Sequence, residues 1–171
     1  MRIELASLEG KEGNVAHAYE PAELSLDEER VTLEQPPKIA GRILRDGARV
    51  IVEGEIGAVT RIECDRCLRP IELPVKAQFK VEYVTPEAYQ VEQDAELEEE
   101  DLALSTFDGE TIDVDELVRE QVLLEVPAHA LCQEDCKGLC PVCGVDRNQS
   151  NCNCQTSEID PRWSGLKDMR F

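Results

Sequence analysis

Eight cysteines are the residues of this 171-residue chain whose type and spacing point most directly to chemistry. They form four short pairs, Cys64 with Cys67, Cys132 with Cys136, Cys140 with Cys143, and Cys152 with Cys154. Tetrahedral zinc takes four soft ligands, and thiolates a few residues apart supply them from tight turns. In the run Cys-Pro-Val-Cys-Gly, Pro141 stiffens the turn, and Gly144 can adopt the left-handed backbone that lets amides approach the thiolates. The cysteines therefore predict two structural zinc ions.

The eight ligands can be divided between two sites in more than one way. The grouping we prefer places Cys140, Cys143, Cys152 and Cys154 on one zinc, because all four lie within fifteen residues and can close a site locally. The second zinc then takes Cys64, Cys67, Cys132 and Cys136. An alternative joins Cys64 and Cys67 to Cys140 and Cys143, as two facing zinc knuckles. The sequence does not choose between these groupings.

The expected compartment also favours metal ligands over disulfides. The start of the chain carries Glu4 inside any apolar run, so a secretory signal is not expected and the protein is placed in the cytoplasm. Paired cysteines in a reducing compartment are typical of metal sites. A thioredoxin-like redox pair requires a helix N-terminus, whereas a strand pattern follows Cys67. His129, close before Cys132, is an alternative ligand, although an ordinary surface or packed histidine is the simpler interpretation.

Other catalytic motifs are missing from the sequence. It has two histidines and contains no phosphate-binding glycine loop, nucleophile elbow or H-E-x-x-H motif. Its carboxylates occur in runs, which usually face solvent. No run of about 18 apolar residues suggests a membrane span. We therefore expect a protein that is not an enzyme and that has neither a small-molecule substrate nor a membrane partner.

Two strand patterns flank the first cysteine pair. Asp46-Gly47 is a signal for a two-residue hairpin turn. Apolar and charged residues alternate over 50–62, with Gly54 and Gly57 as expected bends or bulges, and alternate again over 71–83, where Pro74 indicates an edge position. The pair Cys64 and Cys67 is thus expected at a hairpin tip.

A helix is predicted later in the chain. Asp113 is an N-cap acid with Glu116 three residues on, and an apolar face continues to Leu124 before Pro127 ends the helix. A second, short helix is expected after Asp160-Pro161, with Trp163 facing inward.

Together these elements predict an α+β fold, with a twisted, mainly antiparallel β-sheet, one packed helix and a C-terminal Cys-rich, zinc-bound appendage. Residues 1–35 are assigned weakly patterned N-terminal strands, and Pro36-Pro37 is expected to break the chain. Residues 36–130 form the β-sheet core with an acidic insertion and the helix. Residues 131–171 form the Cys-rich, zinc-binding segment.

The formal net charge of −19 is distributed unevenly. Residues 82–125 hold 16 acidic residues and one basic residue, a net charge of −15, whereas residues 38–80 hold nine basic and six acidic residues, a net charge of +3. An extensive grip on nucleic-acid phosphates is disfavoured, because it needs a surplus of cations. The run from Glu92 to Asp101 is either a solubilising loop or a surface that attracts and steers a basic protein.

Three motifs resemble the YceD-like family. They are Cys64-Asp65-Arg66-Cys67-Leu68-Arg69-Pro70 before an alternating strand, the acidic stretch leading to the helix that ends Leu124-Glu125-Val126-Pro127, and the C-terminal part with Cys136-Lys137-Gly138-Leu139-Cys140-Pro141-Val142-Cys143-Gly144, Cys152-Asn153-Cys154 and Asp160-Pro161-Arg162-Trp163. The resemblance spans roughly Lys38 to the end. It implies a non-enzymatic role in large-ribosomal-subunit biogenesis and in the accumulation of its RNA.

On this basis we expect a factor that binds a basic large-subunit ribosomal protein or a pre-ribosomal particle through its acidic segment. The mildly basic hairpin places Arg61, Arg66 and Arg69 near the first cysteine turn, where they can touch ribosomal RNA locally. The alternative is a nucleic-acid-binding regulator built on zinc ribbons, which the cysteine spacing favours and the net negative charge opposes.

Overall fold

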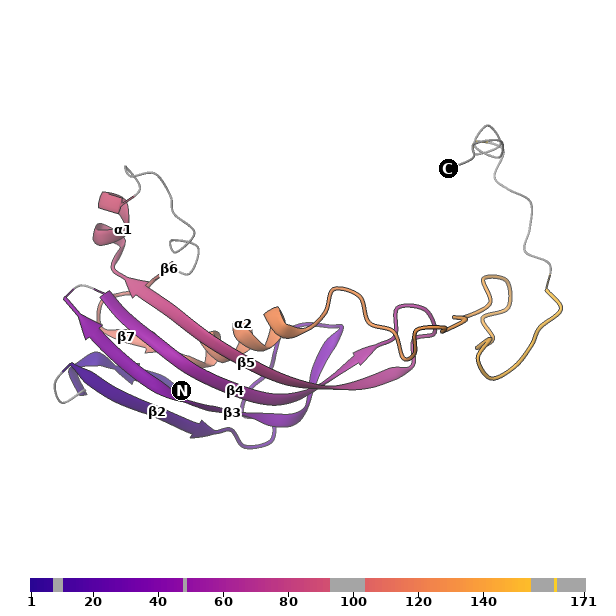
Figure 1. Ribbon diagram of the computed structural model, residues 1–171, viewed down its shortest axis with the longest axis horizontal. Coiled ribbons are helices and arrows are strands. Elements are labelled where there is room, and N and C mark those ends of the chain that lie inside the picture. Colours follow the sequence, from indigo (N-terminus) through magenta and orange to yellow (C-terminus); the bar gives the residue numbers. More distant parts are fainter. Residues whose placement is uncertain (8–10, 48, 93–103, 155–161, 163–171) are drawn as a thin grey trace. The chain divides into compact units, whose positions relative to one another are not determined.

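Three long strands lie at the centre of the larger part of the molecule (Figure 1): β3 (Val31–Asp46), β4 (Arg49–Glu63) and β5 (Pro70–Val84). The computed structural model describes residues 1–7, 11–47, 49–92, 104–154 and 162. The chain divides into two units. The sheet unit comprises residues 1–62 and 70–128, and the cysteine unit comprises residues 63–69 and 129–171. The cysteine unit thus takes one short segment from the connection between β4 and β5 and the rest from the end of the chain.

The larger sheet has the strand order β2-β3-β4-β5-β6, with β2 at Glu12–Ala18 and β6 at Leu104–Thr106. The pairs β2–β3 and β3–β4 are antiparallel, whereas β5 and β6 pair in parallel over Glu82–Val84. A second, two-stranded sheet pairs β1 (Arg2–Glu4) antiparallel to β7 (Thr111–Asp113). The described elements therefore form a mixed α+β fold that is mostly sheet.

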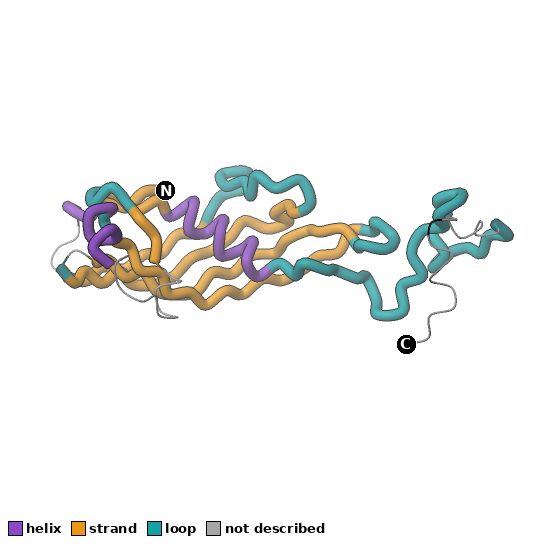
Figure 2. Tube along the Cα trace, turned by 90° about the horizontal axis from the view of Figure 1, so that it is seen from above, coloured by secondary structure: helices purple, strands orange, loops and turns teal. Residues whose placement is uncertain are grey.

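One main helix, α2 (Val114–Glu125), packs against β5, β1 and β3, and Figure 2 shows it running along the strands. Two shorter helical elements are the 3-10 turn Leu5–Ser7 and α1 (Pro86–Glu92). The carboxylate of Asp113 accepts hydrogen bonds from the backbone N–H groups of Asp115 (3.0 Å) and Glu116 (3.3 Å), which confirms the predicted N-cap.

Helical periodicity predicted the inner face of α2 with one error. Val114, Leu117, Val118 and Val122 are buried, but Leu124 in the last turn is 70% exposed. The apolar pattern shows which side of a helix faces inward, but it does not show how far along the helix its neighbours extend.

The alternation in β4 and β5 builds the core of the sheet unit. The predicted inward positions of β4 are buried: Val50, Val52, Ile56, Ala58 and Ile62. In β5 the inward positions from Val75 to Tyr83 are buried, while Ile71 and Leu73 at the start of the strand are only half-buried. Most residues of opposite parity are at least partly exposed, because successive side chains of a strand point to opposite faces. The exception is Val84 at the end of β5, which is fully buried.

The prediction that Pro36-Pro37 breaks the chain is wrong. β3 continues through both prolines and keeps its pairing with β4, although the register shifts between Leu33 and Gln35 and again between Gln35 and Lys38. Proline lacks a backbone N–H donor, and strands tolerate it at bulges and edges. The prolines therefore disturb the ladder without ending the strand.

Gly54 is special for a reason that its position in the strand pattern did not reveal. It pairs with Gly41 across β3 and β4. A Cβ atom on Gly54 would lie 2.3 Å from the carbonyl oxygen of Ala40, and one on Gly41 would lie 2.3 Å from that of Glu53. Both positions require glycine because the two backbones approach so closely.

The N-terminal region is less regular than the strands that follow it. Ile3 lies in β1 and Leu33 in β3, whereas Leu24 and Leu26 are buried in an irregular loop between β2 and β3. Their apolar character reflects burial without strand structure. The helix expected after Asp160-Pro161 lies outside the described residues.

Candidate metal centres

Two cysteine turns in the cysteine unit share one backbone geometry. In the first, the N–H of Cys64 donates to the carbonyl of Arg69 (2.9 Å), and the N–H of Leu68 donates to the carbonyl of Cys64 (2.9 Å). In the second, the N–H of Cys140 donates to Val145 (2.9 Å), and the N–H of Gly144 donates to Cys140 (2.8 Å). Each turn thus presents its two thiols from the same hydrogen-bonded loop.

The residue after the second cysteine of each turn has a left-handed backbone. Its φ is 72° at Gly144, as the sequence predicted, and 58° at Leu68. Glycine adopts this conformation without strain, whereas a side chain with a Cβ does so at a steric cost. The second turn is therefore the relaxed form of the first.

The tertiary structure brings the eight cysteines into two groups of four. Cys64, Cys67, Cys132 and Cys136 form the first centre, and Cys140, Cys143, Cys152 and Cys154 form the second. Within each group the sulfur atoms all lie within 4.8 Å of one another. This is the grouping that we preferred on sequence grounds. The alternative, with both C-x-x-C turns on one ion, does not occur.

The sulfur positions fit a tetrahedral metal. A Zn–S bond of about 2.3 Å places sulfurs about 3.8 Å apart along the edge of a tetrahedron. The Sγ atoms of Cys64 and Cys136 are 3.8 Å apart, and those of Cys67 and Cys132 are 3.6 Å apart. A disulfide needs about 2.05 Å between its sulfurs. The first centre therefore has the dimensions of a four-thiolate metal site.

The electrostatics of the first centre would favour a bound cation. Burial alone would raise the pKa of the Cys64 thiol, but hydrogen bonds from the backbone amides of Cys132, Arg66 and Cys67 outweigh it and lower this pKa to about 6. Burial and the neighbouring cysteine sulfurs raise the pKa of Cys132 to about 12. One thiol thus ionises readily and then opposes ionisation of the others, since like charges repel. A divalent ion removes this opposition.

The second centre shows the same division. Backbone amides of Cys143 and Val142 lower the pKa of Cys140 to about 6, while the contact with Cys143 and burial raise the pKa of Cys154 to about 12. The two centres differ in solvent access, however. Three ligands of the first centre are buried, whereas Cys143 and Cys154 of the second are exposed.

A glycine and an arginine join the two chain segments that make the first centre. The guanidinium of Arg66 donates to the carbonyl of Cys136 (2.9 Å), and the N–H of Leu139 donates to the carbonyl of Arg66 (2.9 Å). A Cβ atom on Gly138 would lie 2.8 Å from that same Arg66 oxygen, and the φ of Gly138 is 69°. Only glycine lets the segments approach this closely.

Asp65 makes a further link between the segments. Its N–H donates to the carbonyl of Ala130 (2.9 Å), and its carboxylate accepts from the N–H of Ala130 (2.9 Å). The same carboxylate lies 3.5 Å from Nδ1 of His129, whose side chain is 93% exposed. His129 is in neither group of candidate ligands, so the thiols alone make up both.

Asn148 connects the second centre to the first. It lies between Cys143 and Cys152 in sequence, yet its side-chain amide donates to Sγ of Cys136 in the first centre (3.4 Å). Its side-chain oxygen accepts from the N–H of Lys137 (2.8 Å). Groups that hydrogen-bond to metal ligands orient them and tune the affinity of the site. Asn148 is therefore an outer partner of the first centre.

Asp146 positions both Asn148 and Arg69. Its carboxylate accepts from the N–H (2.9 Å) and the side-chain amide (2.7 Å) of Asn148 and lies 3.2 Å from Nη2 of Arg69. These contacts with Asn148 and Arg69 hold the pKa of the carboxyl below its usual range. No sequence motif points to Asp146 or Asn148, because neither lies within a cysteine pair.

The three arginines proposed for RNA contact all make contacts within the protein. Arg61, in the sheet unit, lies 2.6 Å from the carboxylate of Glu34. Arg66 donates to Cys136, and Arg69 pairs with Asp146. Arg61 and Arg69 remain about half-exposed, with side-chain exposures of 48% and 43%. A role in RNA contact stays a prediction for all three.

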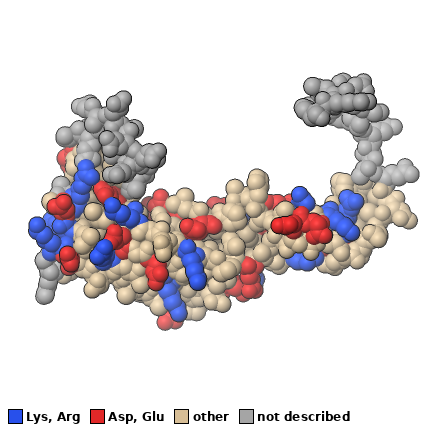
Figure 3. All heavy atoms as spheres, in the orientation of Figure 1, with Lys and Arg blue, Asp and Glu red and all other residues tan. Residues whose placement is uncertain are grey.

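The acidic run is only partly described. Residues 93–101 lie outside the described residues, and Glu92 ends α1. On the face seen in Figure 3, acidic and basic side chains are interspersed over the described surface. No described helix has the length and apolar character needed to cross a membrane.

Comparisons with known proteins point to one family. A family model described as "Large ribosomal RNA subunit accumulation protein YceD" matches residues 52–170, a stretch that includes all eight cysteines. The chain is similar to an uncharacterised protein of Mycobacterium tuberculosis, with 38% identity over 120 residues, which cover 70% of this chain and 55% of that protein. No solved structure matches the chain significantly.

Two plant proteins carry a descriptive name. Both are called "Large ribosomal RNA subunit accumulation protein YCED homolog 1, chloroplastic". The protein of Arabidopsis thaliana is 36% identical over 59 residues, covering 34% of this chain and 18% of the plant protein. The protein of Zea mays is 24% identical over 159 residues, which cover 79% of this chain and 54% of the plant protein. The chain spans about half the length of the mycobacterial relative that it matches.

Proposed function

Because this protein belongs to the YceD family, we propose that it supports the accumulation of large-subunit ribosomal RNA as a non-enzymatic assembly factor. The observation that carries the proposal is the family match over residues 52–170, which covers most of β4, all of β5 and α2, and the cysteine unit up to residue 170. The names of the two plant relatives attribute large ribosomal RNA subunit accumulation to those proteins.

We propose that each cysteine centre holds one structural zinc ion. Zinc favours four thiolates in tetrahedral geometry, and closed four-ligand sites have no open position for a substrate. When bound, the ion supplies cross-linking between chain segments. The chain itself supplies the ligands, the amides that favour thiolate at Cys64 and Cys140, and the outer hydrogen bond from Asn148.

The partner that best suits the charge is a basic large-subunit ribosomal protein or a pre-ribosomal particle that displays one. Residues 82–125 carry a net charge of −15, which attracts cationic proteins and steers their approach. Arg61, Arg66 and Arg69 offer cationic atoms for local contact with ribosomal RNA. We also propose a cytoplasmic location for this protein.

A zinc-ribbon regulator that binds nucleic acid is the second candidate, and the paired cysteine turns favour it. Such a protein needs cations that are available to phosphates. The formal net charge of −19 opposes such binding. The charge therefore favours the assembly role.

The proposed function can be tested in cells that lack the protein. We expect a lower ratio of large-subunit to small-subunit ribosomal RNA and an accumulation of large-subunit precursors in sucrose gradients. Wild-type protein supplied from a plasmid should restore both. Tagged protein, captured at low salt, should recover large-subunit proteins or precursor particles. A normal RNA ratio together with recovery of no large-subunit component contradicts the proposal.

A further inference from the structure

The sheet unit contains a groove between the loop that follows β2 and the first half of β3. It has a volume of about 370 Å³. Leu24, Leu26 and Val31 line it as buried apolar residues, and Pro36 and Pro37 lie along its wall. We refer to this feature as the proline groove.

The two prolines explain why the groove exists. β2 pairs with β3 only from Lys38 onward, and the N–H of Tyr19 makes one last bond to the carbonyl of Pro37 (3.1 Å). Proline cannot donate to a ladder, so β2 leaves the sheet at this point. An isolated bridge between Glu28 and Val31 closes the other end. Between these points, no described strand pairs with this edge of β3.

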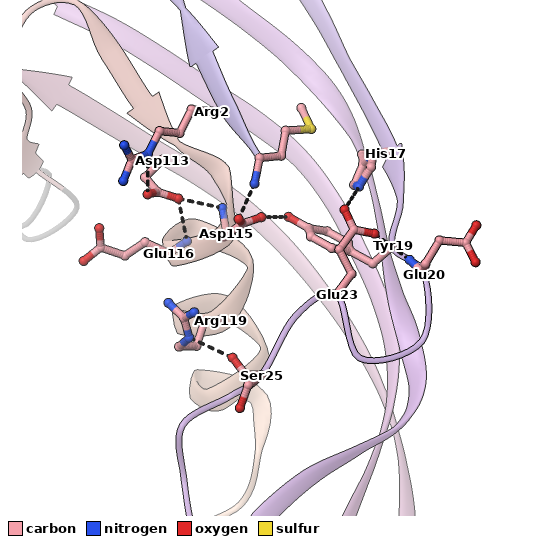
Figure 4. Close-up of polar contacts among 11 residues, drawn as sticks. Arg2, His17, Tyr19, Glu20, Glu23, Ser25, Asp113, Asp115, Glu116 and Arg119 are labelled. Atoms are coloured by element: carbon pink, nitrogen blue, oxygen red, sulfur yellow. Dashed lines mark hydrogen bonds and ion pairs between the residues drawn. The ribbon is translucent and has the colours of Figure 1, made fainter.

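The loop that forms the outer wall is held to helix α2, as Figure 4 shows. The hydroxyl of Tyr19 donates to the carboxylate of Asp115 (2.7 Å), and Nε of Arg119 donates to the carbonyl of Ser25 (2.9 Å). The N–H of Glu20 donates to the carboxylate of Glu23 (2.6 Å). These contacts keep the groove open without a ligand, so no free energy of binding is spent on forming it.

The charge of the groove has one sign. Its lining includes four carboxylates, those of Glu20, Asp27, Glu28 and Glu34, and no lysine, arginine or histidine. Asp27 lies 3.4 Å from Arg119, and Glu34 pairs with Arg61. In the described part of the chain, neither Glu20 nor Glu28 forms an ion pair through its carboxylate. Two uncompensated acids therefore flank an apolar floor.

We propose that the proline groove binds an extended, lysine- or arginine-rich segment of a partner protein, with apolar side chains between its cations. The apolar residues would lie on Leu24, Leu26 and Val31, and the cations would meet Glu20 and Glu28. An extended segment suits the open edge of β3, because strand addition satisfies backbone groups there. A nucleic acid is disfavoured, since its phosphates would face carboxylates.

This inference takes its class of partner, a basic protein, from the proposed function. The two can fail separately, because peptide binding is measured with the purified protein and RNA accumulation is measured in cells.

The test uses a fluorescein-labelled octapeptide in which lysine alternates with valine, and the full chain purified with zinc. Fluorescence anisotropy should show saturable binding that weakens as salt is raised. The double variant Glu20→Gln and Glu28→Gln should raise Kd about fivefold, as expected for two exposed ion pairs. The matched control is Glu12→Gln with Glu72→Gln, which changes the net charge equally outside the groove and should leave Kd almost unchanged.

The alternative outcomes are distinct. Equal weakening by both double variants shows that only overall charge attracts the peptide, and it overturns the proposal. Failure of the wild-type protein to bind the peptide also overturns the proposal. The same holds if the protein binds a uridine oligonucleotide instead of the peptide and this binding depends on Glu20 and Glu28. Unchanged circular dichroism in both variants excludes unfolding as the cause of a lost signal.

Discussion

The sheet unit and the cysteine unit bury different kinds of residue. In the sheet unit the largest fully buried side chains are aliphatic, including Ile43, Ile56 and Leu117. In the described part of the cysteine unit the buried residues are Cys64, Cys67, Cys136, Gly138 and Cys140. Of its larger apolar side chains, Leu68, Leu131 and Val142 are exposed, and Leu139 and Val145 are half-buried. One unit is stabilised by apolar burial, whereas the described part of the other has almost no apolar core.

The difference explains how one chain supports two small folds. A short segment without an apolar core needs disulfides or metal ions to remain folded, and thiolate–zinc bonds supply that energy directly. The proposed metal ions therefore do for the cysteine unit what aliphatic burial does for the sheet unit. Four experiments test this contrast.

The largest effect is expected on removal of metal. Structural zinc supplies about 10 kcal/mol or more of apparent binding energy, so a strong chelator should unfold residues 63–69 and 129–154 and leave the sheet unit folded. Hydrogen exchange should show lost protection only in residues 63–69 and 129–154, and protection should recover when zinc is added back. Equal protection with and without chelator would contradict the contrast.

The converse experiment weakens the sheet unit. Leu117 is 1% exposed, and Leu117→Ala should lower the free energy of unfolding of the sheet unit by about 2–5 kcal/mol through the lost contacts and the cavity left behind. Zinc content should not change. Leu124→Ala, on the same helix at a position 70% exposed, is the control and should change stability by less than about 0.5 kcal/mol. A loss of zinc in Leu117→Ala would show that the units are not independent.

A smaller effect is expected at Asn148. Asn148→Ala removes the hydrogen bond to Cys136 Sγ and should lower the zinc affinity of the first centre about 10–100-fold. Competition with a chromogenic chelator measures this change. Asn151→Ala removes an exposed amide of the same type and should have no effect. Equal affinities in both variants would mean that the ligands alone set the strength of the site.

The smallest effect compares the two cysteine turns. Leu68→Gly relieves a left-handed backbone at an exposed position and should stabilise the metal-bound cysteine unit by about 1 kcal/mol. Gly144→Ala introduces the same strain in the second turn and should destabilise it by about the same amount. Thermal unfolding of the zinc-bound protein measures both. Shifts of the unfolding temperature in the same direction in the two variants would show that the turns are not equivalent.

The sequence predicted those features that local pattern encodes. The alternation over 50–62 and 71–83 located β4 and β5, and Asp113 located the start of α2. Errors arose where a neighbour distant in sequence decides the outcome. Pro36-Pro37 remain within β3 because β4 lies beside them, and Leu124 is exposed because the face of α2 is not covered to its end.

The sequence by itself determined the donor set, because the type and spacing of thiols are local properties of short turns. It also determined the strands that carry the first pair to a hairpin tip. The tertiary structure alone decided that Cys64 and Cys67 join Cys132 and Cys136, and that Asn148 reaches Cys136. It also decided that a groove opens beside Pro36 and Pro37. These features depend on distances between residues far apart in the chain, and packing sets such distances.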